Sequence, residues 1–141
     1  MSTNRFVASA IAAIAAIAGL IAVGPAVAHH STAAFDTAQV LKIEGTIKQF
    51  RWINPHASIK IDGGGSAGVW TIEMTAANAL INEGWTRDAL QVGDKVTIYA
   101  NPLRNAITLN DGSMGGLYVG VVLANGSTLG RTDGKGAAPS N

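Results

Sequence analysis

The sequence contains no cysteine, and this absence excludes several kinds of site at once. Without thiolates there can be no disulfide, no cysteine-bound zinc or iron–sulfur cluster, and no cysteine nucleophile. Only 13% of the residues are charged and the formal net charge is +1, which excludes a strongly basic nucleic-acid binder and an acidic solvating tail. A chain of 141 residues indicates one domain, and any metal site in it must use nitrogen and oxygen ligands.

Apolar residues are concentrated at the N-terminus, in the order of a secretory signal peptide. Arg5 precedes an Ala- and Ile-rich run over residues 6–23, and a Gly-Pro breaker leads to Ala26-x-Ala28. An uncleaved membrane anchor is the alternative, but the run is at the lower length limit for crossing a bilayer and no basic stop follows it. We therefore expect cleavage after Ala28, a periplasmic or secreted protein, and no stable membrane anchor.

Composition divides the chain into four segments. We expect a signal peptide at 1–28, an N-terminal arm at 29–39, a β domain at 40–130 and a disordered tail at 131–141. Cleavage would remove Arg5, one of the ten Lys and Arg residues, and none of the nine Asp and Glu residues. The exported domain would therefore be formally neutral.

Alternating apolar and polar residues from Val40 onward predict β-strands. After Ile47 the alternation shifts by one residue, so that Phe50 and Trp52 take the apolar positions. Such a shift predicts a β-bulge, and Gly45 would permit a sharp bend. The other expected elements are strands at 57–61, 69–74, 96–100 and 115–123, and a helix at 76–83 with Thr75 as its N-cap.

Three strands, a short helix and two further strands are the element order of an oligonucleotide/oligosaccharide-binding (OB) barrel. The sequence therefore predicts a mainly β fold, a small five-stranded OB-like barrel with one short helix between strands three and four. A small β-sandwich is the alternative, although sandwiches normally have more strands and no helix.

All three histidines follow the expected cleavage site. The α-amine and imidazole of His29 can chelate one metal ion, and His56 or His30 can supply a further nitrogen. This donor set favours copper(II), with zinc(II) next. The alternative is that His29 and His30 are solvated and His56 bonds within its loop, because these three residues form no recognised spacing motif.

A second hypothesis is a module that binds a protein, a peptide or a small organic ligand without metal. Its binding face would contain Trp52, Trp70 and Trp85, together with Asn54 and Glu73, although tryptophans are more often core residues. We expect no nucleic-acid partner, because base-stacking barrels normally add a cationic groove. No catalytic constellation is recognisable, so we expect the protein not to be an enzyme. An enzyme that performs oxidative chemistry at a copper site is the third hypothesis.

Several short motifs between residues 29 and 129 are specific in combination. They are His29-His30-Ser31, Phe35-Asp36, Glu44-Gly45-Thr46, Trp52-Ile53-Asn54-Pro55-His56-Ala57, Trp70-Thr71-Ile72-Glu73, Gly84-Trp85-Thr86-Arg87 and Gly93-Asp94-Lys95-Val96. In these motifs the chain resembles a family of small secreted bacterial proteins known as a domain of unknown function. The resemblance implies export and a small β-barrel-like fold, and it implies no activity. It draws attention to His29, His30, Asn54, His56, Glu73 and Trp85.

Overall fold

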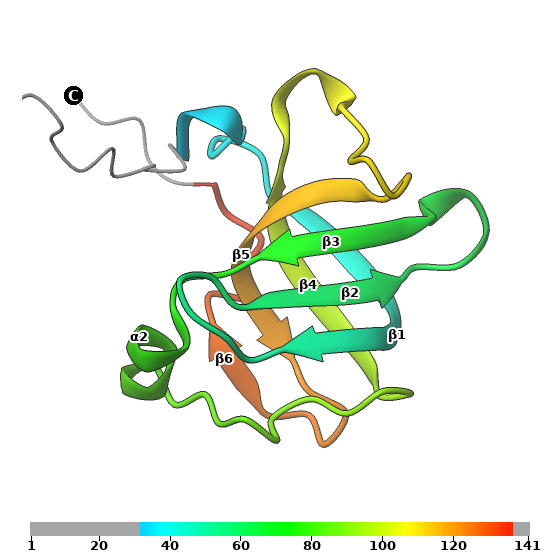
Figure 1. The fold of residues 1–141 in the computed structure, drawn as a ribbon. Helices are drawn as coiled ribbons and strands as arrows, with labels where there is room; N and C mark the ends of the chain where they lie inside the picture. The colour runs from blue at the N-terminus through cyan, green and yellow to red at the C-terminus, as the bar shows by residue number, and fades with distance from the viewer. Residues whose placement is uncertain (1–31, 137–141) are drawn as a thin grey trace, which may run out of the picture. The chain divides into compact units, whose positions relative to one another are not determined.

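The computed structural model describes residues 32–136, which fold into a closed β-barrel (Figure 1). The elements in chain order are η1 Thr32–Ala34, β1 Leu41–Arg51, β2 Ser58–Asp62, η2 Gly65–Ala67, β3 Val69–Glu73, α2 Ala77–Asn82, β4 Lys95–Pro102, η3 Arg104–Ala106, β5 Met114–Val122 and β6 Thr128–Gly130. The expected signal peptide, His29 and His30 lie outside the described residues, as do residues 137–141.

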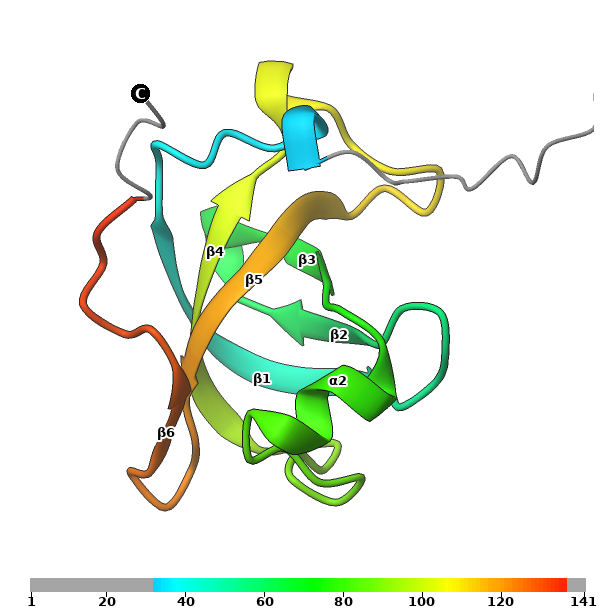
Figure 2. The ribbon, with the colours of Figure 1, turned by 90° about the vertical axis from the view of Figure 1, so that its left-hand side faces the viewer.

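The strands form one sheet in the order β3-β2-β1-β4-β5-β6, and a pairing of β3 with β5 closes it. All neighbours are antiparallel except β3 and β5, which run parallel. The first part of β5 pairs with β3 and its last part pairs with β6, as Figure 2 shows. The predicted five-stranded OB-like barrel with one short helix between strands three and four is confirmed, and β6 adds a short strand to it.

β1 serves both halves of the barrel because a bulge bends it. Its first part pairs with β4 and its last part with β2, and the pairing with β2 shifts between Ile47 and Gln49. The extra residue is Lys48, which confirms the bulge predicted from the shift in alternation. A glycine is also required at position 45 for close packing, because a side chain there would overlap the carbonyl oxygen of Asp62.

The core is the apolar interior that the alternation predicts. Its completely buried members include Ile47, Ile59, Ile61, Ile72, Leu80, Ile98 and Val121. Aromatic rings extend this core toward α2: the ring centroid of Phe50 lies 5.7 Å from that of Trp52 and 5.7 Å from that of Trp85, and Trp85 lies 5.4 Å from Tyr118. Such separations are typical of favourable edge and tilted ring contacts.

The helix α2 begins later than expected, and the predicted cap is wrong. The N-cap residue is Ala76, and no side chain caps the helix. Thr75 is still extended, because its carbonyl accepts a hydrogen bond from the Ala57 amide and so prolongs the β2–β3 ladder. Gly84 ends the helix at φ +87°, as the sequence predicts. Among residues 32–136 no helix has the length and apolar character needed to cross a membrane.

The arm before β1 packs against the end of β4. Phe35 is 6% exposed and forms a β-bridge with Leu103. The Asp36 amide donates to the Pro102 carbonyl at 2.8 Å, so the arm is hydrogen-bonded as well as packed. The start of the described chain is thereby held at one end of the barrel, where η1 lies above the end of β3 in both ribbon views (Figures 1 and 2).

Candidate functional site

The structure brings together two of the residues singled out in the sequence, His56 and Glu73. His56 Nδ1 lies 3.7 Å from Glu73 Oε1 and 3.3 Å from the Met74 carbonyl oxygen. Their side chains are 40% and 32% exposed. The neighbouring Ala57 is completely buried, and its backbone bonds to both Met74 and Thr75. This short ladder holds the backbone that carries His56 beside the end of β3.

The contact with Met74 decides the chemistry of the imidazole. A neutral histidine that donates from Nδ1 to a carbonyl carries its lone pair on Nε2. An Nδ1–H bond to a carbonyl or carboxylate is the arrangement that orients histidine ligands in metal sites. With Nδ1 donating to the Met74 carbonyl, neutral His56 would have the tautomer expected of a ligand that binds through Nε2.

The other two predicted nitrogen ligands, His29 and His30, lie outside the described residues. Within residues 32–136, no group of three or more His, Asp or Glu side chains is placed to hold a metal ion. The described part of the arm is anchored through Phe35, which forms a β-bridge with Leu103 just after β4.

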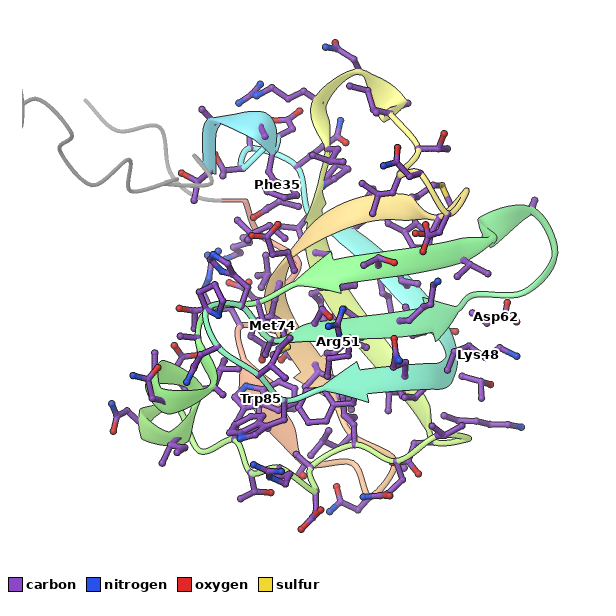
Figure 3. The ribbon with its side chains drawn as sticks, in the orientation of Figure 1. Phe35, Lys48, Arg51, Asp62, Met74 and Trp85 are labelled. Atoms are coloured by element: carbon purple, nitrogen blue, oxygen red, sulfur yellow. The ribbon has the colours of Figure 1, made fainter. Side chains whose placement is uncertain are left out.

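The three tryptophans do not share one face. Trp85 is 1% exposed and lies in the core beside Phe50 and Tyr118, on the α2 side of the barrel (Figure 3). Trp52 packs on Phe50 and is partly exposed. Trp70 is 9% exposed and donates its indole N–H to the Ala67 carbonyl at 2.8 Å.

Asn54 lies in the exposed loop between β1 and β2, where its peptide bond to Pro55 is cis. Polar groups in the aromatic cluster are largely satisfied. The Tyr118 hydroxyl donates to the Leu129 carbonyl at 2.8 Å, and burial raises the pKa of Tyr118 above its usual range. Trp85 Nε1 is the one buried side-chain nitrogen or oxygen in the described part of the chain without a hydrogen-bond partner.

A hollow of about 370 Å³, absent from the sequence predictions, lies beside Trp70. It is bounded by the arm, the end of β4, the η3 turn and the start of β5. Its lining residues are Asp36, Gln39, Leu41, Trp70, Pro102, Leu103, Arg104, Asn105, Ala106, Ile107, Met114 and Gly115. They come from four separate stretches of sequence. Asp36 and Trp70 belong to motifs named above, but only Trp70 was a candidate binding residue.

The loop between β4 and β5 is fastened to the outer face of the sheet by a polar network. Asp111 accepts from Lys60 Nζ at 2.6 Å and from the hydroxyl and amide of Ser113 at 2.6 and 3.0 Å. Ser113 is 1% exposed, and its hydroxyl also lies 2.8 Å from that of Thr71. The bonds from Lys60 and then Ser113 hold the pKa of Asp111 well below its usual range.

This network predicts a pH-dependent contribution to stability. Because the pKa of Asp111 is lowered by folding, its contribution is present above the unfolded pKa of about 3.9 and is lost as pH falls toward the folded pKa. We expect the difference in melting temperature between the natural protein and Asp111→Asn to be constant near neutral pH and to shrink below about pH 4. Thermal unfolding followed by circular dichroism at several pH values measures this difference in melting temperature. A difference that does not change with pH would contradict the stabilising role of the Asp111 carboxylate.

The geometry defines a class: a small OB-like barrel with a surface His–Glu pair at one end and an apolar hollow near the arm. The chain belongs to a family described as "Family of unknown function (DUF6152)", whose sequence pattern matches residues 17–113. A comparison with curated proteins finds no match. Among solved structures, the chain is similar to the mitochondrial single-stranded DNA binding protein Rim1 from S. cerevisiae. The two share 14% identity with a TM-score of 0.43, over 67% of this chain and 98% of that chain.

Proposed function

We propose that the chain is an exported OB-like domain that binds copper(II) through His29 and His56, with His30 assisting. The observation that supports the proposal is the contact of His56 Nδ1 with the Met74 carbonyl, which favours the tautomer that binds metal through Nε2. The α-amine and imidazole of His29 would complete a set of three nitrogens after cleavage at Ala28. Zinc(II) is the alternative metal, because the same nitrogens also bind it, although less strongly than copper(II).

Glu73 supports a cation at this position. Its carboxylate lies 3.7 Å from Nδ1 of His56 and is only partly exposed, so it adds negative charge on the side of the ring opposite Nε2. The α-amine titrates near pH 7.7–8.0 in model peptides. Copper(II) would therefore displace the remaining proton of the amine when it binds near neutral pH.

The test is a copper(II) titration of the cleaved protein by isothermal calorimetry, with electron paramagnetic resonance to report nitrogen ligation. One additional residue before His29 moves the amine away from the imidazole and is expected to weaken binding by roughly 100-fold or more. This is because loss of an outer-shell partner alone costs about 10–100-fold. His56→Ala is expected to do the same, and Glu73→Gln to cost about tenfold.

Gln91→Ala, in an exposed turn between α2 and β4, serves as the matched control and should bind copper like the natural protein. Equal affinity in the cleaved and N-terminally extended proteins would exclude the proposed chelate. A mature protein whose first residue is not His29, shown by mass spectrometry, would also remove the central ligand.

A second candidate function is favoured by a separate observation, the apolar hollow beside Trp70. It supports a small-ligand-binding module that needs no metal, and it allows the class of ligand to be argued from the residues at its mouth.

A further inference from the structure

Apolar side chains form part of the lining of the hollow near the arm. Leu41, Trp70, Leu103 and Met114 line it, and its volume of about 370 Å³ lies within the range of sites for small molecules, about 300–1,000 Å³. Ile107 continues the apolar surface at the rim, where it is 56% exposed. A ligand seated here would remove apolar surface from water on both sides of the contact.

Two opposite charges lie together at the mouth of the hollow. Arg104 Nη1 and Asp36 Oδ1 are 3.9 Å apart, at the long limit of an ion pair. The Nε of Arg104 donates to the Ala33 carbonyl at 3.1 Å, which ties the guanidinium to the arm. Because exposed ion pairs of this kind contribute little to stability, a ligand can replace the contact at low cost.

The backbone of the η3 turn at the mouth is unusual. Asn105 has φ +64° and Ala106 has φ +48°, two consecutive non-glycine residues in the left-handed region. Asparagine tolerates this conformation, whereas alanine does so at a cost in energy. Strained backbone of this kind is enriched at ligand-binding loops, and the two residues that flank it, Arg104 and Ile107, both line the hollow.

We propose that this hollow binds a free α-amino acid with a bulky apolar side chain. The ligand carboxylate pairs with the Arg104 guanidinium, and its ammonium group pairs with the Asp36 carboxylate. The apolar side chain lies against Trp70, Leu103 and Met114. A zwitterion matches the two neighbouring opposite charges, whereas a simple carboxylate or amine would leave one of them facing a like charge. This site goes beyond copper binding and is independent of His29 and His56.

The test is calorimetric titration with L-phenylalanine and L-leucine in the presence of a chelator, because free amino acids also bind copper. Both amino acids are expected to bind, and glycine is not. 3-Phenylpropionate, which lacks the ammonium, and phenethylamine, which lacks the carboxylate, are each expected to bind about tenfold or more weakly, because each loses one charge-assisted hydrogen bond.

Arg104→Gln and Asp36→Asn should each weaken phenylalanine binding by about tenfold while the melting temperature shows that the protein folds. Arg87→Gln and Asp88→Asn, a second exposed pair of opposite charges outside the hollow, are the matched controls and should bind normally.

His56→Ala should also leave phenylalanine binding unchanged, which separates this site from the copper proposal. Absence of binding by either amino acid overturns the inference. Equal binding of phenylalanine and 3-phenylpropionate contradicts the role of Asp36.

Discussion

Replacing Trp85 by alanine is expected to lower the free energy of unfolding by about 3–5 kcal/mol, the range for removing a large aromatic side chain from a packed core. Trp85 is 1% exposed, and its ring contacts those of Phe50 and Tyr118. It connects the residues after α2 to both β1 and β5, so its removal opens a cavity between three elements. Urea denaturation followed by far-ultraviolet circular dichroism measures the change without depending on tryptophan fluorescence.

Trp85→Phe is the informative companion. It keeps a ring against Phe50 and Tyr118 and removes the indole N–H, which is buried without a hydrogen-bond partner. Because an unsatisfied buried donor costs about 1–3 kcal/mol, its removal offsets part of the lost packing. We therefore expect a clearly smaller loss than for alanine. A loss below about 1 kcal/mol for Trp85→Ala would contradict the core position of this side chain.

The second large effect is expected at Gly45, where β1 passes the turn that follows β2. A Cβ atom at this position would overlap the Asp62 carbonyl oxygen and lie 2.8 Å from its carbon. Both are backbone atoms, so neither can move aside as a flexible side chain would. Gly45→Ala is expected to lower the free energy of unfolding by about 1–3 kcal/mol, the usual cost of overpacking.

Chemical denaturation of Gly45→Ala checks this expectation, with Glu44→Ala as the control in the same strand. Glu44 is exposed, and within the described residues its side chain forms an ion pair only with Lys42. Its removal should therefore barely change the denaturant concentration at the midpoint of unfolding. If both variants unfold at the same denaturant concentration as the natural protein, the close approach at Gly45 does not exist.

Strand positions were predictable because burial imposes a period of two on the sequence. Ile59 and Ile61 alternate with polar residues, and Ile72 does so on the next strand, so the positions of β2 and β3 follow directly from the pattern. The phase shift after Ile47 likewise predicted the bulge. The sequence did not show that Lys48 is its extra residue, because an exposed lysine fits either side of the shift.

Other features depend on tertiary contacts that leave no local pattern. The cap at Thr75 was predicted wrongly because its carbonyl is recruited by Ala57, 18 residues earlier in the pairing of β2 with β3. The strand β6 is only three residues long, which is too short for a period to be read. The bridge of Phe35 to Leu103 likewise joins residues far apart in the chain, so the packing of the arm could not be anticipated.

The candidate site was predictable in part. His56 and Glu73 each drew attention in the sequence, but the register of the β2–β3 hairpin was needed to bring them together: Ser58 faces Glu73, which places the preceding loop at the end of β3. The charge pair of Asp36 and Arg104 could not be predicted at all. It exists because the arm and the η3 turn meet across the end of the barrel.

Closure of the barrel also affects how the protein behaves at high concentration. An unpaired strand edge is a template on which another chain can add, and long flat edges lead to aggregation. Here the outer edge of β3 is covered by β5, and the last strand of the sheet, β6, offers an edge of only three residues. The parallel β3–β5 pairing, described above as the step that closes the fold, thus also protects the barrel from edge-to-edge association.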